Sequence, residues 1–349
     1  MSIIRERDSN LAELLQLEPE QWALHAPLQT INFAPFQQAG VELSIKREDL
    51  LHRHLSGNKL YKLFGHLQQA KRLGATCLSS FGGYYSNHLH ALAYAGEALG
   101  VKTHAIVRGH RPKVLSATLK DCSARGMALE FVSRLDYAEL KNKCLGESLQ
   151  QRLQGQSYWV PEGGGAIEGI AGCAAIVQGI KSQLEQRLPQ KSAVPLTLCV
   201  PVGTGTTAAG ILSQLAQGDS LLGYSALRFG DGLADVEASV RQLSGNERVS
   251  WQLFDESHFG GFAKTRADLF QFMEAFTRAT GILLDPIYTA KTLYHMTQQV
   301  QDGYWQSGQH LVMVHTGGLQ GRRGFDALVS ASDNYVNDNN EKNNLVGVR

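Results

Sequence analysis

Apolar positions along most of the chain follow two alternating patterns. Short β-like runs are followed repeatedly by stretches in which apolar residues recur every three or four positions. The first such pair is a run at 75–80 and a helical stretch at 87–99, and the last strand-like run is at 311–315. Strands that alternate with helices in this way are typical of βαβ units and a parallel sheet. The pattern therefore predicts an α/β protein.

The remaining expected elements follow the same alternation. A period-two run at 41–46 predicts a half-buried strand, after a short helix at 11–15 and an extended lead-in at 26–29. Further strands are expected at 103–107, 128–133, 158–160, 196–202, 221–228 and 249–254, and further helices at 114–125, 137–153, 167–187, from 206, and at 233–243, 266–280 and 289–301.

About eight such units could close into a (β/α)₈ barrel. The irregular leading segment and the Gly-rich breaks near 82 and 163 instead favour two open sheets. A length of 349 residues also suits one large domain with a smaller partner. The last stretch, 332–349, has six asparagines among charged residues, and we expect a disordered polar tail.

Composition indicates which kinds of partner the protein binds and in which cell compartment it works. Thirty-three basic and 32 acidic residues leave a formal charge of +1, without a basic stripe for nucleic acid or a membrane surface. The five cysteines are widely spaced and include no C-x-x-C pair, which is typical of reduced thiols in a cytosol. Residues 1–8 are charged, and no apolar run approaches transmembrane length. We expect a cytoplasmic protein with a small-molecule ligand.

One lysine is placed for carbonyl chemistry. Lys59 opens an amphipathic helical stretch, and Ser56 or Asn58 could cap its free N–H groups. A cation in the first turn opposes the helix dipole, so the neutral amine is favoured there. A neutral amine can attack a carbonyl to form a Schiff base. The alternative is an ordinary surface lysine.

A Gly-rich loop between an expected strand and helix predicts a phosphate site. Glycines allow close backbone approach, and the helix N-terminus offers free N–H groups. The donors come from Gly203, Thr204, Gly205, Thr206 and Thr207. A Walker A motif is excluded because Ile211 stands in place of its lysine. A dinucleotide site remains an alternative, since Gly203-x-Gly205-x-x-Ala208 satisfies its loose form.

A second turn carries Ser86, Asn87 and His88 at the start of a helix, and such a turn can bind a carboxylate. A simple N-cap by Ser86 is the alternative. His88 and His90 lack a third ligand at a recognisable spacing, so no metal is expected. Further Gly-rich turns at 162–165 and 315–318 suggest that four turns share one ligand crevice.

These motifs together resemble the pyridoxal-phosphate-dependent family of D-cysteine desulfhydrase and 1-aminocyclopropane-1-carboxylate deaminase, over roughly residues 25 to 330. The motifs are Lys46-Arg47-Glu48-Asp49-Leu50, Gly57-Asn58-Lys59, Ser86-Asn87-His88, Gly203–Thr207, Asp285-Pro286-Ile287-Tyr288-Thr289-x-Lys291 and His315-Thr316-Gly317-Gly318. The resemblance implies the tryptophan-synthase-β-like fold (fold type II). A large domain would comprise 1–60 and 173–331, a small one 61–172, and the assembly would be a homodimer.

The resemblance also implies a role for each matched residue. Lys59 would be the Schiff-base lysine and proton shuttle, and Tyr288 an acid or base over the reacting face. The other implied contacts are Gly203 to Thr207 with the phosphate, Asn87 with the phenolic oxygen, Thr316 with the pyridine nitrogen, and Ser86, Asn87 and His88 with the substrate.

The chain departs from the family at three places that line the site: Tyr85 replaces a common Gln, Ser56 a Gly, and Phe262 an active-site Tyr. Deaminases of the family also carry Glu where this chain has Thr289. A cyclopropane carbon leaves poorly, whereas a thiol leaves readily as a thiolate. We therefore expect α,β-elimination of D-cysteine, with the cyclopropane deaminase as the alternative. A nicotinamide oxidoreductase and a non-catalytic sensor remain as rivals.

Overall fold

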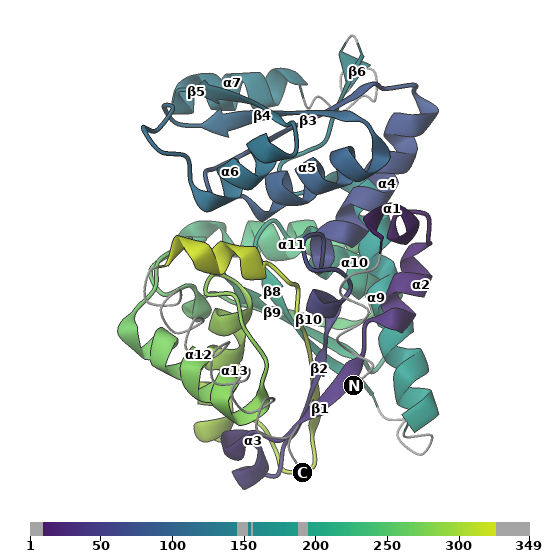
Figure 1. Cartoon of the computed structure of the whole chain (residues 1–349). Coiled ribbons are helices and arrows are strands. Elements are labelled where there is room, and N and C mark those ends of the chain that lie inside the picture. Colours follow the sequence, from purple (N-terminus) through teal and green to yellow (C-terminus); the bar gives the residue numbers. More distant parts are fainter. Residues whose placement is uncertain (1–9, 145–152, 155, 188–194, 326–349) are drawn as a thin grey trace, which may run out of the picture.

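The computed structural model describes residues 10–144, 153–154, 156–187 and 195–325. The expected tail at 332–349 lies outside these residues. The described residues form two open α/β layers, one above the other in Figure 1, each built around its own sheet. The predicted α/β class with two open parallel sheets is confirmed, and the barrel is excluded.

The larger sheet has six strands in the order β1-β2-β11-β8-β9-β10. Only β1 runs antiparallel to its neighbour; the other pairs are parallel. Its central strands are buried along nearly their whole length, which explains why they appear in the sequence as unbroken apolar runs. The strands are β1 (Leu28–Ile31), β2 (Glu42–Lys46), β8 (Thr197–Val202), β9 (Ser220–Ser225), β10 (Ser250–Phe254) and β11 (His310–Val314).

Helices pack against this sheet and against each other. They are α3 (Ala34–Gln38), α10 (Thr206–Gln214), α11 (Leu233–Ser244), α12 (Ala267–Thr280) and α13 (Thr289–Gln301), with short 3-10 turns η2 (Glu48–Leu50), η4 (Gly230–Gly232), η5 (Glu256–His258) and η6 (Leu319–Gly324). A cluster of aromatic and aliphatic side chains from α3, α12 and α13 fills one face of the sheet.

The smaller sheet has five strands in the order β5-β4-β3-β7-β6, and only the β6–β7 pair is antiparallel. Its strands are β3 (Cys77–Gly82), β4 (Lys102–Arg108), β5 (Ala128–Val132), β6 (Leu153–Gln154) and β7 (Ser157–Trp159), and its helices are α5 (Asn87–Leu99), α6 (Ala117–Ala124) and α7 (Arg134–Cys144). The chain leaves the larger sheet after β2 and returns to it at β8. The finer domain boundaries, after residues 60 and 172, stay predictions.

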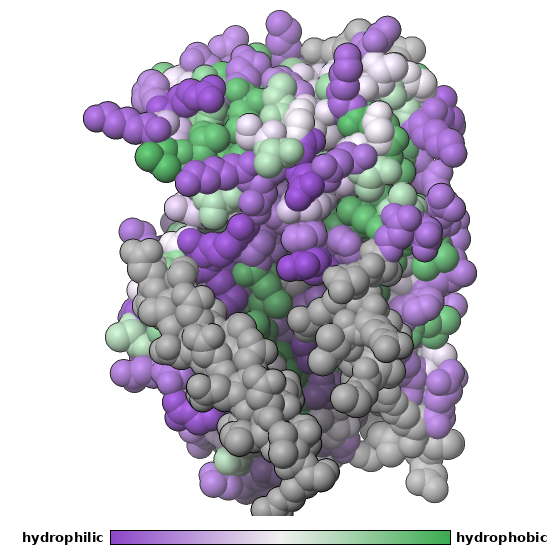
Figure 2. Space-filling view, in the orientation of Figure 1, coloured by the Kyte–Doolittle hydropathy of each residue, from purple (hydrophilic) through white to green (hydrophobic). Residues whose placement is uncertain are grey.

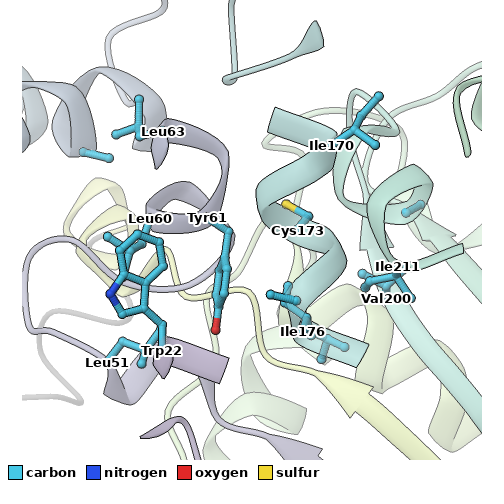
Figure 3. Close-up of a cluster of buried hydrophobic side chains, with 14 of the residues drawn as sticks. Trp22, Leu51, Leu60, Tyr61, Leu63, Ile170, Cys173, Ile176, Val200 and Ile211 are labelled. Atoms are coloured by element: carbon cyan, nitrogen blue, oxygen red, sulfur yellow. The ribbon is translucent and has the colours of Figure 1, made fainter. Parts of the chain in front are cut away.

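Two helices cross between the layers and pack against each other at the right of Figure 1. They are α4 (Asn58–Arg72) and α9 (Ala166–Arg187). A Cβ added at Gly172 would lie 2.0 Å from the Tyr61 carbonyl oxygen, and one at Gly65 would lie 2.6 Å from that of Glu168. The two backbones therefore touch. Trp22 and Tyr61 pack edge to face beside this contact, and Figure 3 shows Tyr61 and Cys173 on the facing sides of the two helices.

The structure differs from the expected elements in several places, and one of them is the short helix α3, which was not expected. Helix α1 (Leu11–Leu14) is present as expected, but a second helix, α2 (Pro19–His25), precedes the extended lead-in. The helix expected at 137–153 does not reach its end, because Leu153 pairs as a strand with β7. The helix expected from 114 begins at Ala117, where Ser116 caps it.

Candidate active site

The predicted site residues converge on one cavity of about 800 Å³ between the carboxyl ends of the strands of both sheets. Its lining includes Lys59, Ser86, Asn87, His88, Gly203, Thr204, Gly205, Thr207, Tyr288 and Thr316. Thr206 is the one predicted residue outside the lining, and its hydroxyl lies 3.1 Å from that of Thr204. In Figure 2 the outline of the molecule is indented at the left between the two layers.

Lys59 is positioned by a glycine, and not by a polar cap. The N-cap of α4 is Gly57, with φ +65° and no side-chain cap, so the expected capping by Ser56 or Asn58 is wrong. Asn58 instead donates from its amide nitrogen to the Thr207 hydroxyl at 2.9 Å, and its main-chain N–H donates to the Thr316 carbonyl at 3.3 Å. The residue before the lysine thus ties it to the Gly-rich loop and to the strand end at Thr316.

Burial depresses the pKa of Lys59 well below its ordinary value, and the nearby Lys62 ammonium adds to the effect. The neutral amine expected from the sequence is therefore favoured. The main cause is loss of hydration on burial, and not the helix dipole on which the sequence argument relied. Lys62 is buried as well, its pKa is also lowered by burial, and it lines the same cavity. Sequence reasoning did not assign it a role, although its spacing of three places it on the same helix face as Lys59.

The Gly-rich loop after β8 has the form of an anion cradle. Gly205 has φ +77°, and a Cβ there would lie 2.7 Å from a Val240 methyl, so only glycine fits. In the described residues the main-chain N–H groups of Gly205, Thr206 and Thr207 make no hydrogen bond. A bound anion would satisfy these free donors at the start of α10.

The turn after β3 combines capping with free donors. The Ser86 hydroxyl oxygen accepts from the Leu89 N–H at 3.2 Å, which leaves the hydroxyl proton available. The Asn87 carbonyl oxygen accepts from the Gln320 amide at 2.8 Å, so its own NH₂ group remains free for another partner. The N-cap and the donor roles proposed for this turn are thus compatible.

The imidazole ring of His88 is held by a hydrogen bond with the Ser80 hydroxyl. The Ser80 hydroxyl donates to the Val160 carbonyl, so it must accept from His88 Nε2–H at 2.8 Å. Nδ1 is then a bare acceptor, buried and without a partner among the described residues. Burial, with Lys59 nearby, lowers the pKa of His88 well below its ordinary value. The neutral ring in this tautomer cannot donate to a carboxylate, whereas the His88 main-chain N–H in the first turn of α5 can.

Tyr288 lies across the Gly-rich loop: a Cβ at Gly203 would lie 3.2 Å from its ring. Asp285 fixes this position, because its carboxylate accepts from the N–H groups of Ile287 at 2.8 Å and Tyr288 at 2.9 Å. Burial, with Asp285 and Glu162 nearby, raises the pKa of Tyr288 far above its ordinary value. Its hydroxyl therefore keeps its proton at neutral pH and acts as a donor.

The loop after β10 brings Phe262 to the cavity. The rings of Phe262 and Tyr288 lie 6.3 Å apart at 62°, and Phe262 is 49% exposed. Lys291 holds this loop by donating to the carbonyls of His258 at 2.9 Å and Gly261 at 3.0 Å. Asp285 and Lys291 belong to the motif that the sequence shows, but only the fold reveals their positioning contacts.

Of the two threonines considered near a ring nitrogen, only Thr316 lines the cavity. Thr289 is fully buried, and its hydroxyl accepts from the Asp285 N–H at 2.8 Å. Among the described residues that line the cavity, Glu162 is the one carboxylate, and it pairs with Lys141 at 2.8 Å.

In the part of the chain that the structure describes, no group of three His, Cys, Asp or Glu side chains is placed to hold a metal, and no helix has the length and apolarity needed to cross a membrane.

Comparison with known proteins gave consistent matches. Residues 24–317 match the family described as pyridoxal-phosphate dependent enzyme. The bifunctional D-cysteine desulfhydrase/1-aminocyclopropane-1-carboxylate deaminase of Arabidopsis thaliana is 26% identical over 348 residues, covering 87% of this chain and 82% of that protein. A solved ACC deaminase homologue has a TM-score of 0.72 at 25% identity, covering 92% of this chain and 99% of that one. A fungal L-serine ammonia-lyase from Rhizomucor miehei shares the fold, with a TM-score of 0.60 at 15% identity, covering 84% and 93%.

Proposed function

The chain belongs to the pyridoxal-phosphate dependent enzymes, and on that premise we propose that it is a lyase that converts D-cysteine to pyruvate, ammonia and sulfide. The observation that carries the proposal is the link Lys59–Asn58–Thr207, which places a lysine of lowered pKa beside a free anion cradle. Neither feature explains the other unless both contact one ligand.

The residues present fit pyridoxal phosphate. The unpaired N–H groups of Gly205, Thr206 and Thr207 suit its phosphate, together with Gly203 and the Thr204 hydroxyl. Lys62 supplies a buried cation that such a dianion would stabilise. Asn87 would contact the phenolic oxygen and Thr316 the pyridine nitrogen. When bound, the coenzyme would withdraw electrons from the substrate Cα; the remaining steps belong to the protein.

Lys59 is the proton carrier in this proposal. An amine whose pKa is lowered by burial and by the Lys62 cation can accept the Cα proton near neutral pH. The Tyr288 hydroxyl, which stays protonated, is suited to donate to a departing thiolate. We thus assign Lys59 as the base and Tyr288 as the acid.

The first turn of α5 is the proposed carboxylate site. The Ser86 hydroxyl and the main-chain N–H groups of Asn87 and His88 are donors that make no other hydrogen bond among the described residues. They orient the substrate so that its Cα faces Lys59.

The polar groups near the pyridine site favour elimination over cyclopropane cleavage. Thr316 cannot hold a proton on the pyridine nitrogen as a carboxylate does, and Thr289 is turned away in its contact with Asp285. A weaker electron sink suffices for a leaving thiol, whose pKa is about 8.5, but not for a carbon leaving group. The cyclopropane deaminase remains the second candidate because the relatives that the chain resembles carry that name.

The test is chemical trapping followed by turnover. Purified protein should absorb near the visible edge, and borohydride should fix the coenzyme on Lys59; an adduct mapped to Lys62 would overturn the assignment. D- and L-cysteine, β-chloroalanine, D- and L-serine and 1-aminocyclopropane-1-carboxylate are then scored for keto acid and sulfide. Faster 2-oxobutanoate release from the cyclopropane substrate than pyruvate release from D-cysteine would reverse the choice.

The same experiment separates the rival functions. A bound nicotinamide cofactor would identify an oxidoreductase, and trapped coenzyme without turnover of any amino acid in the panel would favour a sensor.

We further propose a homodimer and a cytoplasmic location. Closure of a cavity between two layers requires one layer to stay mobile. A dimer whose interface lies on the larger layer leaves the smaller layer free to move. Cys77, Cys122, Cys173 and Cys199 are free thiols, as expected in a reducing compartment. A monomer by light scattering at micromolar concentration would refute the dimer, and recovery of the protein in a periplasmic or secreted fraction would refute the location.

A further inference from the structure

The cavity carries more positive charge than the proposed reaction uses. Among the described residues the cationic lining side chains are those of Lys59, Lys62, Arg108 and Arg134, and Glu162 is the one carboxylate that lines the cavity. Lys59 and Lys62 have roles in the proposal above, and Glu162 is paired with Lys141. No carboxylate of the described residues lies within ion-pair distance of Arg108 or Arg134. The guanidinium of Arg108 lies 5.6 Å from the centre of the Tyr137 ring, which leaves its charge intact.

The two arginines lie along the sheet edge that carries the proposed carboxylate site. Arg108 ends β4 and Arg134 begins α7 after β5, while the Ser86 turn follows β3. The order β3, β4, β5 across the sheet places the three turns on neighbouring strands, about 5 Å apart from one to the next. A substrate whose carboxylate is held after β3 would therefore lie within one or two strand spacings of the ends of β4 and β5, where its Cβ substituent can reach the arginines.

The Arg108 end of β4 is fixed in place. Gly109 has φ +111°, and a Cβ there would lie 2.6 Å from the Tyr84 hydroxyl oxygen. Tyr84 can therefore pack against this turn only because residue 109 has no side chain. The Tyr84 hydroxyl donates to the His110 carbonyl at 2.6 Å. The Tyr84 segment before the carboxylate-binding turn thus holds the turn that follows Arg108.

We propose that Arg108 and Arg134 form an anion subsite for the departing Cβ substituent, and that preferred substrates are amino acids whose substituent is already anionic: a sulfonate, a phosphate ester or a sulfate ester. The inference rests on the proposed elimination and specifies its substrate class. The fork of each guanidinium matches the oxygens of such groups.

The reaction balances without a further reactant. The Cα–H bond and the Cβ–X bond break, the proton goes to Lys59, and X departs with the electron pair as sulfite, phosphate or sulfate. Water supplies the keto oxygen of pyruvate, and ammonia is released. Two cations beside X stabilise the charge as the bond breaks.

Binding tests the subsite independently of turnover. The holoenzyme is titrated by calorimetry with 3-sulfopropionate and with propionate, which lacks the second anion. We expect the sulfonate to bind at least tenfold more tightly, and Arg108→Gln and Arg134→Gln each to remove most of that preference while leaving propionate unchanged. Arg111→Gln is the matched control, because Arg111 lies over Phe131 outside the cavity. Equal affinity for the two acids would overturn the subsite.

Turnover separates this inference from the function on which it rests. Both enantiomers of cysteate and O-phosphoserine are compared with cysteine and serine for pyruvate formation. A higher kcat/KM for the anionic member of each pair, lost in Arg108→Gln and kept in Arg111→Gln, supports the subsite. Turnover of D-cysteine without any such preference refutes the subsite and leaves the proposed function standing, whereas absence of a trapped adduct on Lys59 refutes both.

Discussion

Replacing Gly57 by alanine should displace Lys59, the proposed Schiff-base lysine. Gly57 has φ +65° and ψ −157°, a backbone conformation open essentially to glycine alone. An added Cβ would lie 2.0 Å from the Thr316 carbonyl oxygen and 2.7 Å from the Gly317 nitrogen, both of them backbone atoms that cannot rotate away. Relief of this overlap must separate the start of α4 from the strand end at Thr316.

The expected cost follows from two contributions. A residue forced into this region costs about 1–3 kcal/mol, and overpacking against a fixed neighbour costs about a further 1–3 kcal/mol. We therefore expect Gly57→Ala to lower the free energy of unfolding by roughly 2–6 kcal/mol. The hydrogen bond from the Asn58 N–H to Thr316 should be lost, and with it the alignment of Lys59 with the Gly-rich loop.

The matched control is Gly74→Ala, just beyond the C-terminal end of the same helix. Gly74 has nearly the same φ, +67°, but no atom lies within 4 Å of an added Cβ. Its cost should be that of the backbone alone, about 1–2 kcal/mol. Urea unfolding gives both free energies, and the visible absorbance per protein chain reports the coenzyme that we propose Lys59 to hold.

The decisive comparison is between the two variants. Gly57→Ala should unfold at lower urea than Gly74→Ala and should hold less coenzyme, with the remainder less readily trapped by borohydride. Equal stability and full coenzyme content in both variants would show that the contact with Thr316 does not position the lysine.

Three further predictions concern buried charges. Burial raises the pKa of Glu48 from 4.5 to about 7, so the free energy of unfolding should fall as pH rises through about 7 and the carboxyl loses its proton. Glu48→Gln should remove up to about 3 kcal/mol of this fall between pH 5 and 8, as measured by urea unfolding. Lys291→Met removes the donors to His258 and Gly261, and should raise KM about tenfold with little change in kcat; an unchanged KM would contradict the loop-holding role. Asp285→Asn leaves one acceptor oxygen for the N–H groups that two oxygens accept from now. The free energy of unfolding should fall by about 1–3 kcal/mol, and kcat should fall because Tyr288 is less firmly positioned; thermal unfolding and steady-state kinetics measure the two effects.

Periodicity predicted most of the fold because long βα units leave a strong local pattern. The helix at 289–301 and the strand end before Gly203 were predicted to within a residue. Leu153 was placed in a helix although it pairs with β7, and no local pattern records a pairing between strands. The short α2 was missed because its seven residues make only about two turns, too few to show a clear helical period.

The same distinction between local patterns and long-range contacts applies to the candidate site. The Lys59 helix, the Gly203 loop and the Ser86 turn each have a local signature, so the sequence could indicate them separately. Their convergence on one cavity, the Nε2–H tautomer of His88 and the lack of a carboxylate partner for Arg108 among the described residues depend on how distant segments pack together. Such contacts have no signature in a single sequence.

The touching backbones of α4 and α9 determine how the molecule can move. Where Gly65 and Gly172 let two helices meet without intervening side chains, the joint has little freedom to slide, and the layers are left to pivot about it. In any such rotation, displacement grows with distance from the axis. Lys59, two residues from the Tyr61 carbonyl that contacts Gly172, would travel little, while parts of the smaller layer far from the two helices would travel further. Such a rotation would open the cavity at its rim while leaving the nitrogen of Lys59, the proposed Schiff-base lysine, nearly stationary.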